Sequence, residues 1–140
     1  RYQRHFWHCA IPFPKKTSIM TIYNTFMNGH FKKFKPPVLA EVPNVVISAY
    51  NLHNEVEKGF KKTAINFHYE FNIRHLSGVF QGLLLARPDQ FQDGEKLFKM
   101  WVHESERIYG DRLVTETDIQ NFKLKVADQA KKNFSKYNPG

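Results

Sequence analysis

The sequence predicts a mainly α protein, a helical bundle of about five helices. Three observations carry this prediction. Apolar residues recur at helical spacing in five separate stretches, proline or glycine residues bound most of these stretches, and the connections between them are short. The chain has 140 residues, of which 41% are hydrophobic and 15% aromatic, so it is long enough to bury a core of its own.

The first fourteen residues differ from the rest because their pattern is that of a strand. Apolar and other side chains alternate there in the order Trp7, His8, Cys9, Ala10, Ile11. Pro12 and Pro14 then stop the pattern. A single strand is not stable without neighbours. We therefore expect residues 1–14 to belong to a sheet formed upstream in a longer polypeptide, and residues 15–140 to form the helical domain.

Two amphipathic helices are expected next, over residues 17–34 and residues 44–60. Pro36, Pro37 and Pro43 lie between them. Proline has no backbone N–H and clashes with the preceding turn of a helix. The prolines therefore predict a linker between the two helices. The next connection, residues 61–70, alternates in a way that permits a short extended piece.

The third helix, within residues 71–85, combines a strong apolar face with an unusual first turn. Asn72 is a favourable N-cap, and Arg74 and His75 follow it. The helix dipole disfavours cations at this end by about 0.3–1 kcal/mol, so an anionic partner would explain the two residues. Arg74 offers a planar fork of donors that suits phosphate oxygens. From the residues alone, a salt bridge to a carboxylate explains its placement equally well.

The last two helices are bounded by clear signals. The fourth begins at Asp93 and stops at Gly110, and the fifth runs from about Thr115 to Ser135. Thr115 and Asp118 resemble a capping box, with Asp in the place of the preferred Glu or Gln.

Motifs for catalysis are missing from the sequence. It contains no GxxxxGK[ST] and no GxGxxG, so the segment lacks a phosphate-binding loop and is not a complete nucleotide hydrolase. His103 and Glu104 resemble the start of a zinc-protease motif, but Arg107 stands where the second histidine is required. An ion pair between Glu104 and Arg107 is the simpler interpretation. His8 and Cys9 point to opposite faces of a strand, so we expect no metal site.

Charge and composition also limit the partners. The net charge of +8 favours acidic partners, but the lysines gather at helix ends, as expected for solvated termini. No apolar run of about 20 residues and no signal peptide is visible in the sequence. We expect neither nucleic acid nor a membrane as partner. Cys9 is the single cysteine, which fits a reducing, cytoplasmic location.

Several long motifs resemble a known family. They are RYQRHF, PFP, IYNTF, FHYEFNIRHLSGVFQGLL and MWVHESERIYGDRL. In this order and spacing they resemble the segment of an axonemal, outer-arm-like dynein heavy chain that closes its third AAA+ module. The resemblance covers essentially the whole chain. It implies that residues 1–14 are the last strand of the module's α/β core and that residues 15–140 are its helical lid.

The same resemblance implies roles for particular residues. Arg74 matches the lid sensor arginine, which reaches the terminal phosphates of a bound nucleotide, and Ile22 and Pro14 would help line the adenine pocket. Arg4 matches the position from which a module presents an arginine finger to the site of the preceding module. His75 stands where the family commonly has an acidic residue, which leaves the orientation of Arg74 open.

By this resemblance the chain is part of the ATP-driven microtubule motor of cilia and flagella, located in the axoneme. ATP or ADP with Mg would bind in the parent module, which carries the ATPase activity, and no cofactor is expected for the segment alone. The lid would cover the nucleotide and relay its state to neighbouring AAA+ modules, and through the parent to microtubules and other dynein chains. Two alternatives remain: a basic helical module that binds an acidic protein or nucleic acid, and a structural segment in which Arg74 pairs with an internal carboxylate.

Overall fold

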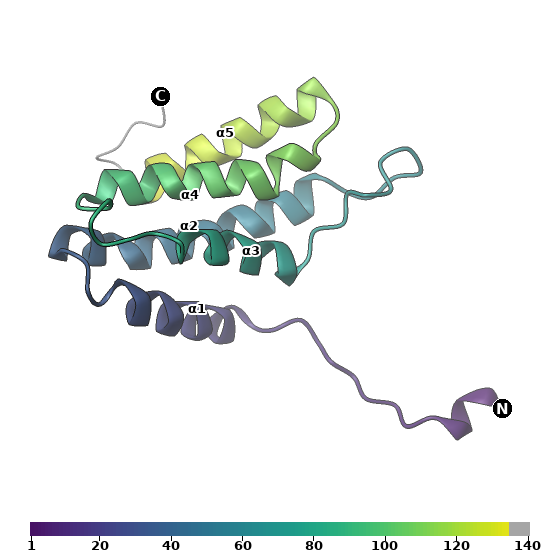
Figure 1. Cartoon of the computed structure of the whole chain (residues 1–140). Coiled ribbons are helices and arrows are strands. Elements are labelled where there is room, and N and C mark those ends of the chain that lie inside the picture. The colour runs from purple at the N-terminus through teal and green to yellow at the C-terminus, as the bar shows by residue number, and fades with distance from the viewer. Residues whose placement is uncertain (135–140) are drawn as a thin grey trace.

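The computed structural model describes residues 1–134, and within them the regular structure is entirely helical (Figure 1). Its α-helices are α1 (Lys16–Phe31), α2 (Pro36–Gly59), α3 (Ile73–Leu83), α4 (Gly94–Ile108) and α5 (Glu116–Asn133). Two short 3-10 helices, η1 (Tyr2–His5) and η2 (Gly110–Arg112), precede α1 and follow α4. The predicted mainly α fold with five helices is therefore confirmed.

Helix α2 is the central element of the bundle. It packs against α1, α3, α4 and α5, and α3 packs in addition against α4. Figure 1 shows α1 on one side of α2, with α4 and α5 on the other. The stacked rings of Tyr23 and Phe80, 4.1 Å apart at their centroids, connect α1 to α3. A second aromatic cluster joins α4 to the end of α5, where Phe98 and Trp101 lie against Phe134.

The prediction of a linker over the three prolines is wrong. Pro36 and Pro37 begin α2, in the first turn, where a missing N–H costs nothing because it has no partner inside the helix. Pro43 lies inside α2, a position that ordinarily costs about 3 kcal/mol. The valines around it, at positions 38, 42, 45 and 46, are completely buried. We infer that burial of this apolar face holds the helix together across Pro43.

The predicted apolar face of the third helix is confirmed. Leu76, Phe80 and Leu83 are buried, and Ile73 and Leu84 are partly buried against the same core. Helix α3 begins after its predicted N-cap, Asn72. Thr115 caps α5 as predicted, since its hydroxyl accepts the backbone N–H of Asp118 at 3.2 Å. The predicted end of this helix, Ser135, lies outside the described residues.

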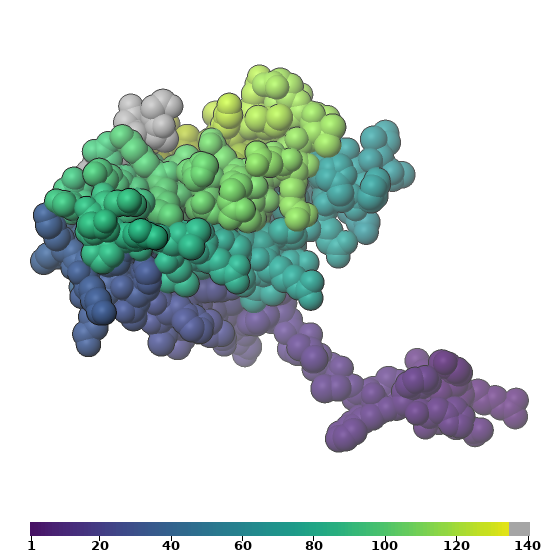
Figure 2. Space-filling model, in the orientation of Figure 1, coloured from purple at the N-terminus to yellow at the C-terminus, as the bar shows by residue number. Residues whose placement is uncertain are grey.

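Residues 1–15, which precede α1, form an exposed arm. Figures 1 and 2 show the arm running away from the bundle as a separate extension. The strand expected over residues 1–14 is not seen: residues 2–5 form η1, and residues 6–14 have no regular structure. Residues 1–134 contain no other strand with which the arm could pair. A core strand at this position therefore stays a prediction.

Candidate functional site

The start of α3 is closed by a reciprocal capping box. The side-chain oxygen of Asn72 accepts the backbone N–H of Arg74 at 3.0 Å. In return, the backbone N–H of Asn72 donates to Nδ1 of His75, also at 3.0 Å. His75 thus accepts the N–H of the N-cap residue, as Glu or Gln does in the common form of this motif. Because Nδ1 accepts, the ring is neutral and carries its proton on Nε2.

A hollow of about 660 Å³ lies beside this helix start. The end of α4, η2 and the segment before α3 surround it. Its lining residues are Phe67, His68, Glu70, Asn72, Arg74, His75, Ile108 and Arg112. The fold therefore brings two arginines and two histidines, distant in the sequence, to the wall of a single hollow.

Both arginines of this hollow present guanidinium groups without protein partners. Within residues 1–134, neither Arg74 nor Arg112 makes a side-chain hydrogen bond or an ion pair. The acid in the hollow, Glu70, pairs instead with Lys62 at 3.3 Å. The internal carboxylate that could have explained Arg74 is thus not found in the described part of the chain. The two side chains remain available to an external anion.

The electrostatic surroundings keep His75 uncharged. Burial of the ring, and then the positive charge of Arg112, lower the pKa of His75 below its ordinary value, while the backbone of Asn72, and then Glu70, act in the opposite direction. The ring also contacts Phe71 and Tyr109, at centroid distances of 5.9 and 6.5 Å. A low pKa agrees with the acceptor role of Nδ1 in the capping box.

A buried pair of polar side chains, His53 and Tyr109, lies next to the site, on the core side of His75. The hydroxyl of Tyr109 lies 3.0 Å from Nδ1 of His53, a completely buried residue of α2. Burial lowers the pKa of His53 to about 4. The same cause raises the pKa of Tyr109. Both side chains are therefore neutral at physiological pH, and they form a fixed polar connection between α2 and the end of α4.

The other expected site residues lie elsewhere. Ile22 is on α1 with 47% of its surface exposed, and Pro14 is exposed in the segment before α1. Arg4 is exposed on η1, where its Nε lies 3.4 Å from Nε2 of His5. None of these three residues lines the hollow that Arg74 lines.

Sequence reasoning missed Arg112 and His68 as members of the site. Arg112 stands in the motif MWVHESERIYGDRL, but nothing in that motif indicates that η2 folds back beside the start of α3. His68 reinforces this closure, since its Nε2 lies 3.1 Å from the backbone oxygen of Arg112. Both residues are recognisable from the three-dimensional arrangement and not from their spacing in the chain.

The predicted ion pair of α4 exists, and its two members differ, because the carboxylate of Glu104 is buried while about half of the Arg107 side chain is exposed. Arg107 donates to a carboxylate oxygen of Glu104 from both Nε and an amino nitrogen, at 3.0 and 2.7 Å. The side chain of Glu104 is only 9% exposed. It packs directly on Gly82 of α3, so that a Cβ at that position would overlap with the carboxylate. The pair therefore fixes α4 against the last turn of α3.

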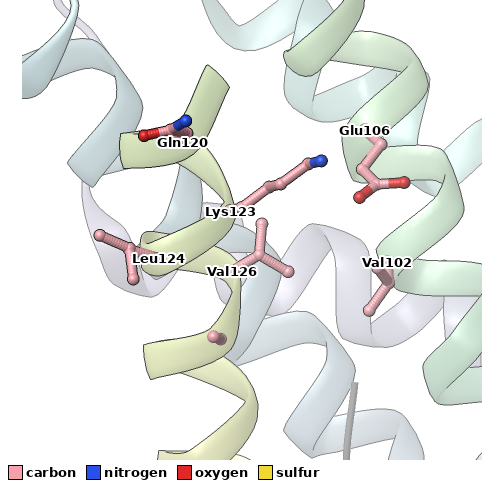
Figure 3. Close-up of a pocket in the computed structure, with 7 residues that line it drawn as sticks. Val102, Glu106, Gln120, Lys123, Leu124 and Val126 are labelled. Atoms are coloured by element: carbon pink, nitrogen blue, oxygen red, sulfur yellow. The ribbon is translucent and has the colours of Figure 1, made fainter. Parts of the chain in front are cut away.

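A second hollow, of about 580 Å³, lies between α4 and α5 (Figure 3). Its apolar wall comes from Val102, Leu124, Val126 and Ala127. Figure 3 shows the amine of Lys123 pointing across it toward the carboxylate of Glu106. None of the expected site residues lines this groove, and its charges are of both signs. The groove therefore lacks the excess of positively charged donors that Arg74 and Arg112 give to the first hollow.

No group of three or more His, Cys, Asp or Glu side chains within residues 1–134 is arranged to hold a metal ion. Among the helices of this part of the chain, none is both long and apolar enough to cross a membrane.

Comparison with known proteins agrees with this architecture. The model of the AAA+ lid domain matches residues 45–138, from within α2 onward. The chain belongs to the AAA+ lid domain family.

Its relatives within that family are dynein heavy chains. The chain is 47% identical over 135 residues to "Dynein alpha chain, flagellar outer arm" of Chlamydomonas reinhardtii. It is 40% identical over 136 residues both to "Dynein beta chain, ciliary" of Tripneustes gratilla and to "Dynein axonemal heavy chain 11" of Sus scrofa. Each match covers 96% of this chain and 3% of the relative. The chain is thus similar to a lid segment of axonemal dynein heavy chains and spans a small fraction of their length.

Proposed function

We propose that the chain is the lid of a regulatory, nucleotide-binding AAA+ module, the third module of an axonemal dynein heavy chain. The observation that carries this proposal is the unpaired guanidinium of Arg74 at the capped start of α3. It faces a hollow that also contains the unpaired Arg112. Membership of the AAA+ lid family and similarity to flagellar and ciliary dyneins support the same context.

The chemistry of the hollow fits the phosphates of ATP or ADP. A guanidinium presents donors in a planar fork that matches two oxygens of one phosphate, and it keeps its charge at every physiological pH. The positive end of the α3 dipole adds to this attraction. Within residues 1–134 no cluster of acidic side chains could hold Mg, so the metal ligands would come from the core of the module.

In this proposal, Arg74 contacts the terminal phosphates and Arg112 adds positive charge at the same place. Ile22 and Pro14 line the adenine pocket. The half-exposed aliphatic side chain of Ile22 suits contact with a flat, apolar ring. Arg4 acts away from the lid, as an arginine finger that stabilises the charge on a nucleotide bound to the preceding module.

The exposed arm supports a place inside a larger assembly. Phe6, Trp7, Ile11 and Phe13 are at least half exposed, which is unusual for so many apolar residues in one segment. We propose that the α/β core of the same module covers them as residues 1–14 become its last strand. The lid then moves as a rigid body with the nucleotide state and passes that state to neighbouring modules. Through the parent chain it serves an axonemal motor that acts on microtubules together with other dynein chains.

The proposal is tested by Arg74→Ala in the parent motor, with Arg87→Ala as the control. Arg87 is exposed but does not line the hollow. We expect Arg74→Ala to weaken nucleotide binding at this module about tenfold or more, because each hydrogen bond to a charged group contributes about 1.5–3 kcal/mol. The nucleotide-dependent release of microtubules should weaken with it. Unchanged affinity in a folded Arg74→Ala motor would contradict the proposed role.

A further inference from the structure

His75 is connected to Arg74 through the backbone of α3. The N–H of Arg74 is bound to the side chain of Asn72, and the N–H of Asn72 is bound to Nδ1 of His75, each at 3.0 Å. Arg74 therefore lies between the two residues whose side chains close the capping box. If the hydrogen bond to His75 is lost, Asn72 keeps only one of the two hydrogen bonds that hold it at the helix start. The backbone that leads from Asn72 to Arg74 is then no longer held in one conformation.

The imidazole ring of His75 is itself held in place. Phe71 and Tyr109 contact it, and the hydroxyl of Tyr109 is fixed by the buried His53. Phe13, in the segment that leads into α1, stacks on the ring of His53 at a centroid distance of 6.5 Å. The orientation of His75 is thus supported through the bundle as far as the arm, and the ring meets the backbone of Asn72 in a defined geometry.

We propose that His75 is a positioning residue for Arg74. The neutral ring of His75 accepts the backbone N–H of Asn72 and so closes the capping box, whereas the charged ring loses this hydrogen bond and the box opens. Nucleotide binding by the lid is therefore weakened by acid. This inference rests on the proposed contact of Arg74 with nucleotide and concerns how that contact is controlled.

The charged groups around the ring support this direction. Arg112 faces it from η2, Glu70 from the segment before α3, and Arg74 is its neighbour in α3. His68, a second titratable group, lines the same hollow. On balance, burial and Arg112 lower the pKa of His75, so the closed box is the neutral-pH state. Protonation disfavours the closed capping box in two ways. It removes the lone pair with which Nδ1 accepts the N–H of Asn72, and it adds a third positive charge beside two arginines.

A direct role for His75 predicts the opposite pH dependence. If the protonated ring itself contacted a phosphate, acid would strengthen nucleotide binding, and replacing His75 with any neutral side chain would weaken it. In the positioning role, acid weakens binding, and a neutral side chain that can still accept the N–H of Asn72 is sufficient. Glutamine is such a side chain and is a preferred residue at this position of a capping box.

The experiment measures the affinity of fluorescently labelled ADP for the parent motor from about pH 5.5 to 8, the range in which histidines titrate. The phosphate-binding loops of the other modules are disabled, so that this module alone is observed. The variants are His75→Gln, His75→Ala and, as a matched control, His103→Gln, an exposed histidine of α4 that does not line the hollow.

We expect the unmodified motor to bind about threefold to tenfold more weakly at the acid end, as for loss of one helix cap. His75→Gln should keep the neutral-pH affinity and lose this part of the pH dependence, whereas His75→Ala should bind weakly at every pH. His103→Gln should behave as the unmodified motor. Because protonation of ADP itself is common to all variants, the difference between His75→Gln and the unmodified motor isolates His75.

Arg74→Ala, measured in the same series, separates the two proposals. If Arg74→Ala weakens binding but His75→Gln titrates as the unmodified motor does, the positioning role is wrong and the nucleotide contact stands. Stronger binding in acid that is lost in His75→Gln would also overturn positioning, in favour of direct contact. If Arg74→Ala leaves the affinity unchanged, the proposed nucleotide contact fails, and the positioning role fails with it.

Discussion

The exposed arm and the helical bundle have similar apolar side chains but opposite surroundings. The two tryptophans show this most clearly, since Trp7 in the arm is 98% exposed and Trp101 in α4 is completely buried. The bundle, residues 16–134, buries a core from all five helices by itself. The arm has no packing partner of comparable size within the described residues. Apolar composition therefore indicates that a segment will be covered, but not which part of the polypeptide covers it.

The largest difference between the two regions is expected from the tryptophans. Trp101→Ala should reduce the free energy of unfolding of the 140-residue chain by about 3–5 kcal/mol, because it leaves a large cavity in the core. Trp7→Ala should change it by less than about 0.5 kcal/mol, as for other exposed sites. Urea denaturation followed by circular dichroism measures both. Comparable losses for the two variants would show that the arm packs on the bundle in solution.

Acid should weaken the bundle through His53. Its pKa is about 4 in the folded chain and about 6.5 when unfolded, so between these values the unfolded chain binds a proton that the folded chain does not. Stability is greatest above about pH 6.5 and falls by about 3 kcal/mol as the pH approaches 4, at about 1.4 kcal/mol per unit. Denaturation curves across this range measure the loss.

His53→Gln is the matched control for this effect, because glutamine can still bond to the hydroxyl of Tyr109 but does not titrate. The variant should lose most of the pH dependence that His53 causes. A slope equal to that of the unmodified chain would mean that other groups are responsible.

Two glycines test how closely the helices of the bundle are packed. Gly82→Ala should destabilise the chain by about 1–3 kcal/mol, because its Cβ would overlap with the buried carboxylate of Glu104, which Arg107 holds in place. Gly29 of α1 has no neighbour within 4 Å of an added Cβ. Gly29→Ala should therefore stabilise the chain by about 0.5–1 kcal/mol, through helix propensity alone. Equal effects on the melting temperature would contradict this account of the α3–α4 contact.

The smallest effect is expected where the arm meets the bundle. Phe13 is half exposed and stacks on His53, so Phe13→Ala should cost about 1 kcal/mol. Phe6 contacts Tyr2 within the arm, and Phe6→Ala should change stability by less than about 0.5 kcal/mol. Thermal unfolding of both variants distinguishes them. If Phe6→Ala costs as much as Phe13→Ala, the boundary between arm and bundle lies nearer the N-terminus.

The sequence predicts most of the fold because helical periodicity and capping are local properties. The apolar face of α3 and the caps Asn72 and Thr115 could be recognised from neighbouring residues alone. The first half of α2 could not. Proline usually ends a helix, and only the burial of the surrounding valines, a tertiary effect, explains why Pro43 does not.

The site was predictable only in part, for the same reason. Arg74 stands out because its charge is unfavourable at the start of a helix. Arg112 becomes part of the site only when the end of α4 folds back beside α3. The role of His75 depends on a side-chain bond to the backbone of Asn72, and the sequence alone presented it as a departure from the family pattern. Contacts between distant elements thus decide which residues complete the site.

The most direct test is the structure of the parent motor with a non-hydrolysable ATP analogue bound to this module. The quantity to measure is the distance from the guanidinium of Arg74 to the terminal phosphate oxygens. The account predicts a hydrogen-bonded distance of about 3 Å, with the capping box of Asn72 and His75 closed. An Arg74 that pairs with a carboxylate of the core and makes no contact with the phosphates would contradict it.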